Sequence, residues 1–199
     1  MAEYDVKSNG NTVISLDDVL KAVAPDGLTG KLPPVHKWHP GQSTDIGMEI
    51  RRDGSWWHDG GRINRPRMVK LFSRILRKDS DGETYLVTPY EKVVVHVEEA
   101  PFLAVRVDRV GEAGPNQVLA FTTNVGDITI AGPDTPLRIE TDADSDEPAP
   151  YVRVRDNLEA KLTRPVFYEL VEMAEAAEGD ADTLGVWSQG EFFTLGATG

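Results

Sequence analysis

Two stretches of the chain carry apolar residues at helical spacing, each directly after an Arg-Pro pair. The apolar positions are Met68, Leu71, Phe72, Ile75 and Leu76 in the first stretch and Phe167, Leu170, Val171 and Ala174 in the second. Residues three and four positions apart share one face of a helix, so each set predicts an amphipathic helix. Pro66 and Pro165 fit the first turn, where proline is favoured. We expect the first helix to end at the turn residues 79–82 and the second at 178–180.

The two helices belong to a longer pattern that occurs twice. Arg65 and Arg164, which precede the prolines, are 99 positions apart. Upstream of each arginine lies an Arg-Asp turn, and downstream lies a short apolar strand. The turns contain Asp53 and Asp156, and the strands are residues 85–87 and 184–187. The sequence therefore predicts a duplicated unit of hairpin, helix and strand.

Alternating apolar and polar residues predict short β-strands in the rest of the chain. Residues 46–50 and 56–58 flank the turn at Asp53-Gly54, which predicts a hairpin. Residues 92–141 contain several short alternating segments separated by Gly, Pro and Asn, which indicates a β-rich middle.

These elements predict an α+β fold with two lobes. We expect the first lobe over residues 31–89 and the second over residues 90–199. Residues 1–30 are expected to form an N-terminal extension. A short amphipathic helix is predicted there, because Leu16, Val19, Leu20 and Val23 follow a capping-box sequence at helical spacing.

The charge of the chain argues against several kinds of partner. The 199 residues have a formal net charge of -12. Nucleic acids and anionic membranes attract basic surfaces, so neither is expected as a partner. A small anionic ligand remains compatible with this charge, because a local arginine cluster can oppose the field of the whole molecule.

Composition limits the chemistry and the compartment. The chain has no cysteine, which excludes disulfides, thiol catalysis and thiolate metal sites. No apolar run reaches the length of a transmembrane helix, and the first residues do not form a secretory signal. The expected location is therefore the cytoplasm.

Arg65 and Arg164 stand at the starts of the predicted helices, where a positive charge is unfavourable. The helix dipole already places partial positive charge there, and Ser, Thr, Asp or Asn would cap the helix better. A bound anion would explain the arginines, because helix N–H groups and a guanidinium together form a phosphate or carboxylate site. The alternative is an internal ion pair with Asp53 or Asp156, which would fix the hairpin against the helix. Both explanations remain open at this point.

Aromatic residues flank the same predicted elements. Their rings can stack on a planar ligand or anchor an interface, and the alternative role is core packing between the lobes. Thr88 and Lys92 are candidates for further polar contacts. The predicted ligand-binding residues are Arg65, Arg164, Trp56, Tyr85, Thr88, Lys92, Tyr168 and Trp187.

Catalytic and metal-binding signatures are weak in this sequence. His36, His39 and His58 have no accompanying cysteine or paired carboxylate at a spacing typical of metal sites, so no metal is expected. The chain contains no Gly-x-Gly-x-x-Gly, Walker or Gly-x-Ser-x-Gly motif. We therefore predict no catalytic residues and no cofactor.

Six stretches, taken in order, resemble the bacterial domain-of-unknown-function 1285 family. They are DGSW (53–56), INRP (63–66), YLVTPYEK (85–92), TTNVGD (122–127), YVRVRD (151–156) and RPVFYEL (164–170). The resemblance covers residues 31–196. It implies a two-lobe α+β protein with an internal duplication and a C-terminal lobe like a pleckstrin-homology-type β-barrel, closed by the helix that begins at Arg164. It also implies a nucleotide-like ligand between the lobes and a signalling role, although no activity is established for the family.

The leading hypothesis is a cytoplasmic ligand-binding module with a signalling role, which binds a small anionic, nucleotide-like molecule between the lobes. One alternative is a structural or protein-interaction module, whose protein partner the sequence does not identify. A second alternative is a hydrolase acting on a phosphorylated small molecule. A groove lined by arginines would favour ligand binding, and converging carboxylates or histidines would favour the hydrolase. Whether the protein is an enzyme is left open, with binding alone favoured.

Overall fold

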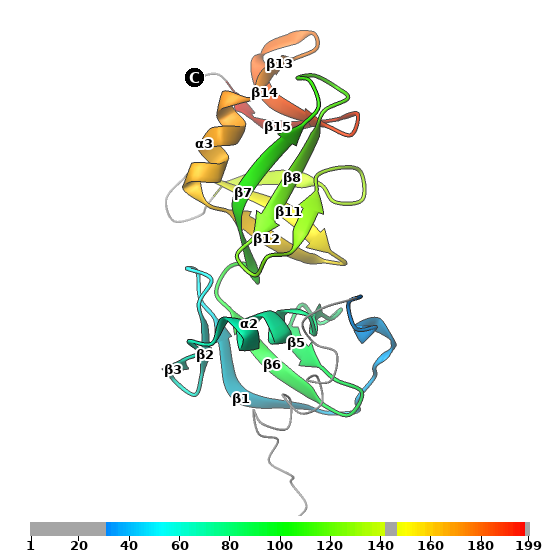
Figure 1. The fold of residues 1–199 in the computed structure, drawn as a ribbon, viewed down its shortest axis with the longest axis vertical. Helices are drawn as coiled ribbons and strands as arrows, with labels where there is room; N and C mark the ends of the chain where they lie inside the picture. Colours follow the sequence, from blue (N-terminus) through cyan, green and yellow to red (C-terminus); the bar gives the residue numbers. More distant parts are fainter. Residues whose placement is uncertain (1–30, 142–146, 198–199) are drawn as a thin grey trace, which may run out of the picture.

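The molecule consists of two lobes arranged along its long axis (Figure 1). The computed structural model describes residues 31–141 and 147–197. Within these ranges the chain is mostly β-strand, with two α-helices, α2 (Pro66–Ser73) and α3 (Arg164–Glu172). The predicted α+β fold with two lobes is confirmed at this level.

The first lobe is a mixed β-sheet with α2 on the face turned toward the second lobe (Figure 1). Its described strands are β1 (Ser43–Ile50), β2 (Trp56–His58), β3 (Gly61–Arg62), β4 (Leu76–Lys78), β5 (Thr84–Val87) and β6 (Lys92–Val97). They lie in the order β3-β2-β1-β6-β5-β4, with β1 parallel to β6. A short 3-10 turn, η1 (Val35–Lys37), is fastened to this sheet because Arg77 Nη1 donates hydrogen bonds of 2.7 Å to Val35 O and Trp38 O.

Strand β6 belongs to the first lobe. Lys92 lies opposite Ser43 of β1 on one side and opposite Val87 of β5 on the other. The first sheet therefore extends to Val97, past the boundary expected between residues 89 and 90. Alternation within a strand reports which face is buried but not which strands pair with it, so the sequence pattern could not assign β6 to a sheet.

The second lobe is built on a curled sheet. Its described strands are β7 (Phe102–Val110), β8 (Val118–Thr123), β9 (Ile128–Ile130), β10 (Leu137–Thr141), β11 (Pro148–Arg155) and β12 (Leu158–Leu162), in the order β10-β11-β12-β7-β8-β9. The two sides of the sheet approach each other, because Thr129 Oγ1 on edge strand β9 donates a 2.9 Å hydrogen bond to Arg153 O on β11. A third sheet of β13 (Glu175–Ala177), β14 (Asp180–Ser188) and β15 (Glu191–Ala197) lies with α3 toward the end of the molecule away from the first lobe (Figure 1).

The same order of elements occurs in both halves of the described chain. The hairpin β1-β2 precedes α2 and the strands β4-β5-β6, and the hairpin β11-β12 precedes α3 and the strands β13-β14-β15. The sheets around them differ, since β6 pairs with β1, whereas β13-β14-β15 form a separate sheet. The order of elements agrees with a duplicated unit, and a common three-dimensional arrangement of the two units stays a prediction.

Helix α2 is shorter than the apolar spacing predicts. It ends at Ser73, and the backbone N–H of Ile75 donates to Phe72 O at 3.0 Å while Ile75 O accepts from Val87 at 2.9 Å. The chain thereby turns directly into β4 beside β5. The expected end at 79–82 is wrong, and these residues lie in the turn between β4 and β5.

Helix α3 also ends earlier than expected. Its last residue is Glu172, and Glu175 begins strand β13, which pairs with β14. Residues 178–180 therefore lie at the turn between β13 and β14 and do not end the helix. The segment 173–178 is rich in Ala and Glu and favours a helix locally, but pairing with β14 overrides this propensity.

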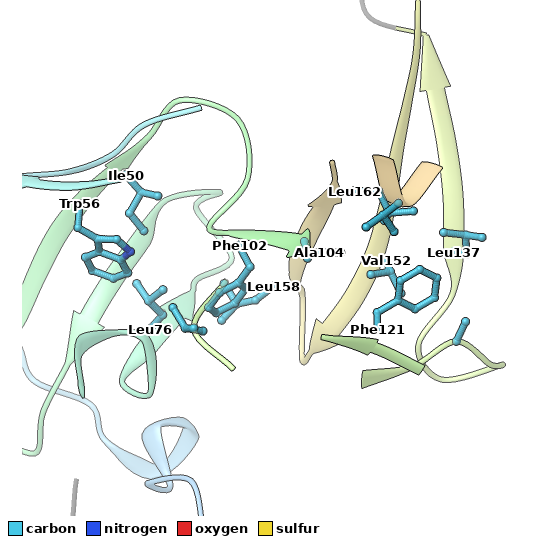
Figure 2. Close-up of a cluster of buried hydrophobic side chains, with 14 of the residues drawn as sticks. Ile50, Trp56, Leu76, Phe102, Ala104, Phe121, Leu137, Val152, Leu158 and Leu162 are labelled. Atoms are coloured by element: carbon cyan, nitrogen blue, oxygen red, sulfur yellow. The ribbon is translucent and has the colours of Figure 1, made fainter. Parts of the chain in front are cut away.

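One hydrophobic core runs through both lobes. Figure 2 shows Phe102 and Leu158 of the second lobe close to Leu76 of the first, with Phe121 and Val152 farther into the second lobe. Phe102 is fully buried and Leu158 nearly so. The junction between the lobes is therefore packed with apolar side chains, which limits independent motion of the lobes.

Hydrogen bonds of polar groups also join the two lobes beside this core. Asn124, in the turn between β8 and β9, directs Nδ2 toward Gly54 O at 3.5 Å and accepts the Leu103 backbone N–H at 3.1 Å. Asn157 donates a 3.1 Å hydrogen bond to Lys78 O. Gly54 lies at a backbone φ of +75°, which glycine adopts without strain.

Replacing Gly54 by Ala is expected to lower the free energy of unfolding by about 2 to 3 kcal/mol, measured by urea denaturation. A Cβ at this position would lie 2.8 Å from Asn124 Nδ2 and 2.9 Å from Leu103 Cδ1. Gly82 is the matched control, because its φ is +87° and a Cβ there meets nothing within 4 Å. Gly82→Ala should cost about 1 kcal/mol through backbone strain alone. Equal losses in the two variants would show that the close approach of the lobes at Gly54 contributes nothing.

The short amphipathic helix predicted from Leu16 to Val23 lies outside the described residues. In the ranges that the structure covers, neither α-helix has the length and apolar character needed to cross a membrane.

Candidate functional site

A cavity of about 550 Å³ opens between the lobes at the beginning of α2. The first lobe contributes the turn after β1, strands β2 and β3, and the first turn of α2, and the second lobe contributes the turn between β8 and β9. The lining residues are Gly54, Ser55, Trp56, Arg62, Ile63, Asn64, Pro66, Arg67, Val69, Lys70, Asn124 and Val125. We call this space the interlobe cavity. Its volume lies within the range typical of small-molecule sites.

Trp56 gives this cavity an apolar wall with one unusual polar atom. Its side chain is only 1% exposed, and the indole stacks on Phe72 of α2 with ring centroids 6.2 Å apart. Its buried Nε1 has no hydrogen-bond acceptor among the described residues. A buried N–H without a partner is costly, so an acceptor supplied from the cavity would lower the free energy of the site.

The charged residues of the interlobe cavity are all basic. Arg62 and Arg67 are exposed at its rim, and Lys70 is half-buried. Among the described lining residues there is no aspartate and no glutamate, although the whole chain has a net charge of -12. The cavity is therefore a local region of positive charge in an acidic protein, which suits an anionic ligand.

Helix α2 adds a positive dipole end to the same place. Its N-cap is Arg65, no side chain caps the helix, and Pro66 occupies the first turn. The side chain of Arg65 is exposed and makes no hydrogen bond or ion pair with the described residues, and it is not among the residues that line the cavity. It stands between two lining residues, Asn64 and Pro66, and its predicted contact with an anion stays a prediction.

Arg164 lies elsewhere on the molecule. It is the first residue of α3, its side chain is 75% exposed, and Nη2 lies 2.6 Å from Glu147 Oε2. Asp53 instead accepts hydrogen bonds from the backbone N–H and the hydroxyl of Ser55, and these bonds hold the pKa of its carboxyl below the usual range. The alternative ion pairs of the arginines with Asp53 and Asp156 are wrong within the described chain, because Arg65 forms no ion pair there and Arg164 pairs with Glu147, the residue before β11.

Tyr85 and Lys92 contact each other on neighbouring strands. The Lys92 Nζ lies 3.7 Å from the centre of the Tyr85 ring and 2.5 Å from Asp79 Oδ2. The Tyr85 hydroxyl donates to Asp81 at 2.8 Å, and this bond is the main cause that raises the pKa of Tyr85 to about 12. Thr88 is buried, and its Oγ1 accepts the backbone N–H of Glu91 at 3.0 Å. These contacts secure the turns before and after β5.

Tyr168 and Trp187 belong to the second lobe with Arg164. Tyr168 is 62% exposed on α3. Trp187 on β14 packs edge-on against Phe192 of β15, with ring centroids 5.1 Å apart. Its backbone carbonyl accepts a 2.8 Å hydrogen bond from Gln117 Nε2.

The eight predicted ligand-binding residues thus fall into three separate places. Trp56 lines the interlobe cavity and Arg65 stands beside it. A second group forms a network around β5 and β6, and a third lies on α3 and β14. The sequence interpretation missed Arg62, Arg67 and Lys70. A signal was present, since residues 60–78 contain seven Lys or Arg and no Asp or Glu.

A second cavity between the lobes has the opposite character. Its volume is about 260 Å³, and Glu83, Glu99 and Glu159 are among its lining residues. Glu159 binds Arg138 at 2.6 Å, and the hydrogen bond from this guanidinium lowers the pKa of the carboxyl. Glu99 accepts from Lys161 Nζ and, at 3.2 Å, from the Tyr151 hydroxyl. Two of the three carboxylates are therefore engaged with neighbouring donors.

The described part of the chain contains no group of three or more His, Asp or Glu side chains arranged to hold a metal ion. His36 and His39 are exposed near η1, and His58 is half-buried at the end of β2.

Two family models match the chain, and the boundary between them lies close to the boundary between the lobes. A family model described as "Domain of unknown function (DUF1285), N-terminal domain" matches residues 33–100. A second, "Protein of unknown function (DUF1285), C-terminal domain", matches residues 101–195. The chain belongs to the DUF1285 family. The resemblance seen in the sequence is thus confirmed, and the first model ends just after β6, where the first sheet ends.

Two solved structures of DUF1285 family proteins are similar to this chain. The protein from Silicibacter pomeroyi DSS-3 is 45% identical, with a TM-score of 0.80 over 90% of this chain and 95% of that chain. The protein from Shewanella baltica OS155 is 30% identical, with a TM-score of 0.50 over 64% of this chain and 92% of that chain. No curated protein matches the sequence.

Proposed function

We propose that this DUF1285 protein is a binding module for a small anionic, nucleotide-like molecule, with the interlobe cavity as its site and a signalling role. The observation that supports the proposal is the combination of three cations, Arg62, Arg67 and Lys70, around a cavity whose wall contains the buried Trp56. Guanidinium groups bind phosphate through paired hydrogen bonds, and an apolar wall suits the body of a planar ligand. The buried Nε1 of Trp56 has no acceptor among the described residues, and a ligand acceptor that reached it would remove the cost of leaving it unpaired.

The cations would bind the charged part of the ligand, and the apolar residues would hold the rest. Ile63, Val69 and Val125 contribute apolar surface, while Asn64 and Asn124 contribute amide donors and acceptors. This division of apolar surface and few polar groups is typical of small-molecule sites. Asn124 also joins the lobes at Gly54, so a ligand in contact with it would stabilise their junction.

The hydrolase alternative gains no support from the interlobe cavity. Its described lining residues include no carboxylate and no histidine that would serve as a general acid or base. The glutamates of the second cavity engage cationic and hydroxyl donors, and Glu159 has a lowered pKa, which suits a structural ion pair rather than a general acid.

We also infer that the second lobe is a pleckstrin-homology-type barrel and that the two halves arose by duplication. The curled sheet, the helix α3 beside β7 and the repeated order of elements support this inference.

The ligand proposal predicts that an anionic nucleotide raises the thermal midpoint of the full chain. Differential scanning fluorimetry with AMP, GMP, a cyclic dinucleotide and inorganic phosphate is the measurement. A nucleotide at about 100 times its dissociation constant should add about 2.7 kcal/mol of stability. For a protein of this size that corresponds to a rise of about 5 to 10 °C.

Arg67→Ala should weaken the effective nucleotide at least about tenfold, because a charge-assisted hydrogen bond contributes about 1.5 to 3 kcal/mol. Arg109→Ala is the matched control, since Arg109 is exposed on β7 and outside the cavity. Binding that is unchanged in Arg67→Ala and Arg62→Ala, or the absence of any shift with all four compounds, would refute the proposal.

A further inference from the structure

A second, chemically different surface lies at the far end of the second lobe. An apolar groove of about 300 Å³ runs between α3 and the strands β14 and β15. It is lined by Pro148, Phe167, Val171, Ala174, Leu184, Leu195, Gly196 and Ala197. We call it the α3 groove. Figure 1 places α3, β14 and β15 away from the first lobe, so this groove is separate from the interlobe cavity.

The α3 groove borders the core, since Leu195 belongs to it and Phe167 packs against it, but the groove also has exposed apolar surface. Val166 and Leu170 already provide the buried face of α3, being 1% and 0% exposed. Phe167 and Val171 form a neighbouring face of the helix, because residues four apart lie one above the other. Val171 remains 43% exposed, and Tyr168 beside it is 62% exposed. A nine-residue helix with a second apolar face that is only partly buried is typical of a surface that binds another molecule.

The surroundings of the α3 groove are predominantly acidic, although Arg164 at the start of α3 pairs with Glu147 beside the groove. From residue 165 to residue 197 the chain has seven acidic side chains and no Lys or Arg. These carboxylates, all exposed, are Glu169, Glu172, Glu175, Glu178, Asp180, Asp182 and Glu191. This end of the molecule is therefore acidic, whereas the segment around α2 is basic, so the two surfaces differ in the sign of their charge.

We propose that the α3 groove docks a basic amphipathic segment of a protein partner. Apolar side chains of the segment would enter between Phe167, Val171 and Leu195, and its Lys and Arg side chains would lie against the surrounding carboxylates. This is the helix-in-groove mode of recognition, in which apolar anchors supply the affinity and charge supplies orientation and rate. An anionic membrane is excluded as the occupant by the same carboxylates, which repel acidic headgroups.

The test uses the full chain and a fluorescent synthetic peptide with Leu at helical spacing and Lys at the other positions. Binding is measured by fluorescence anisotropy at increasing salt. We expect saturable binding that weakens as salt rises. A peptide of the same composition in scrambled order, and a peptide with Glu in place of Lys, should bind at least about tenfold more weakly, since each loses one of the two complementary features.

Variants of the chain locate the binding. Val171→Asp should reduce peptide affinity at least about tenfold, by removing an apolar contact. Val105→Asp is the matched control, because Val105 is 47% exposed on β7 and outside the groove. Glu172→Lys should weaken binding, whereas Glu112→Lys, in the loop after β7, should not. The peptide should also slow hydrogen exchange in α3 and β15, which a merely structural change would not produce.

The outcomes separate this proposal from the nucleotide site. Val171→Asp should leave the nucleotide-induced thermal shift unchanged, so either proposal can fail alone. Equal binding of the scrambled peptide, or equal affinity of Val171→Asp and Val105→Asp, would reduce the interaction to general charge attraction and overturn the proposal. Concentration-dependent dimers that Val171→Asp abolishes would instead assign the groove to a second copy of the chain. Tighter binding of dodecanoate than of the peptide would assign it to a lipid chain.

Discussion

Phe72→Ala should lower the free energy of unfolding by about 3 to 5 kcal/mol, the usual cost of truncating a fully buried aromatic side chain. Phe72 is 0% exposed and stacks on Trp56, so its removal leaves a cavity between α2 and the first sheet. The expected fall in thermal midpoint is about 10 °C, measured by circular dichroism.

Met68 is the comparison on the same helix. It is only partly buried, and the cost of Met68→Ala should therefore be about 1 to 2 kcal/mol. Phe72→Leu keeps most of the side-chain volume and should recover more than half of the loss. A cost for Phe72→Ala no larger than that for Met68→Ala would contradict the assignment of Phe72 as the anchor of α2.

Arg155→Ala should lower the free energy of unfolding by about 2 to 4 kcal/mol, because it removes a largely buried cation that joins the lobes. Arg155 Nη1 lies 2.8 Å from Asp127 Oδ2, and Nη2 donates to Ser73 O at the end of α2. The guanidinium also lies 5.0 Å from the centre of the Phe102 ring. The side chains of Arg155 and Asp127 are 14% and 19% exposed, so little water replaces the lost contacts.

A double-mutant cycle isolates the ion pair between Arg155 and Asp127, which lies within the second lobe and orients the guanidinium that contacts Ser73 O of the first lobe. Arg155→Ala and Asp127→Ala combined should cost less than the sum of the single changes, because both remove the same ion pair. Arg106→Ala is the control, since Arg106 and Asp108 form an exposed pair that should contribute less than about 1 kcal/mol. If the contact of Arg155 with Ser73 O couples the lobes, urea unfolding of Arg155→Ala should give separate transitions by circular dichroism and by tryptophan fluorescence. Strict additivity in the cycle would show that the ion pair with Asp127 does not position Arg155 for its contact with Ser73 O of the first lobe.

Arg155 contacts the C-terminal end of α2, the helix whose N-terminal end lines the proposed binding site. The last carbonyl of α2, that of Ser73, is held by the second lobe, and the first turn of α2 lines the interlobe cavity. A ligand that binds Arg67 and Lys70 would contact the same helix that Arg155 fixes. The C-terminal end of α2 thus contacts the second lobe directly, and a ligand in the interlobe cavity would add a contact near its N-terminal end, so the proposed ligand is expected to stabilise the whole molecule.

The sequence alone determined where the two described α-helices begin. Pro66 starts α2, and Arg164-Pro165 starts α3, because proline has a fixed φ that suits the first turn. The β-rich middle predicted for residues 92–141 is also observed, as in Val118–Thr123, since a period of two residues reports one buried face directly. The repeated order of hairpin, helix and strands could be predicted for the same reason, because it depends on the spacing of residues close together in the sequence.

Only the tertiary structure decided where the helices end, which strands pair, and which charges share a cavity. Ile75 and Leu76 continue the helical spacing, yet they are buried because the chain turns into β4 and pairs with β5. Arg164 has the same sequence context as Arg65, yet it pairs with Glu147 on another face of the molecule. Arg62 and Lys70 are far from Asn124 in the sequence, and they line the same cavity only because the two lobes pack together. Local patterns record which face of an element is apolar, whereas a binding cavity depends on which faces meet, and that is settled by long-range packing.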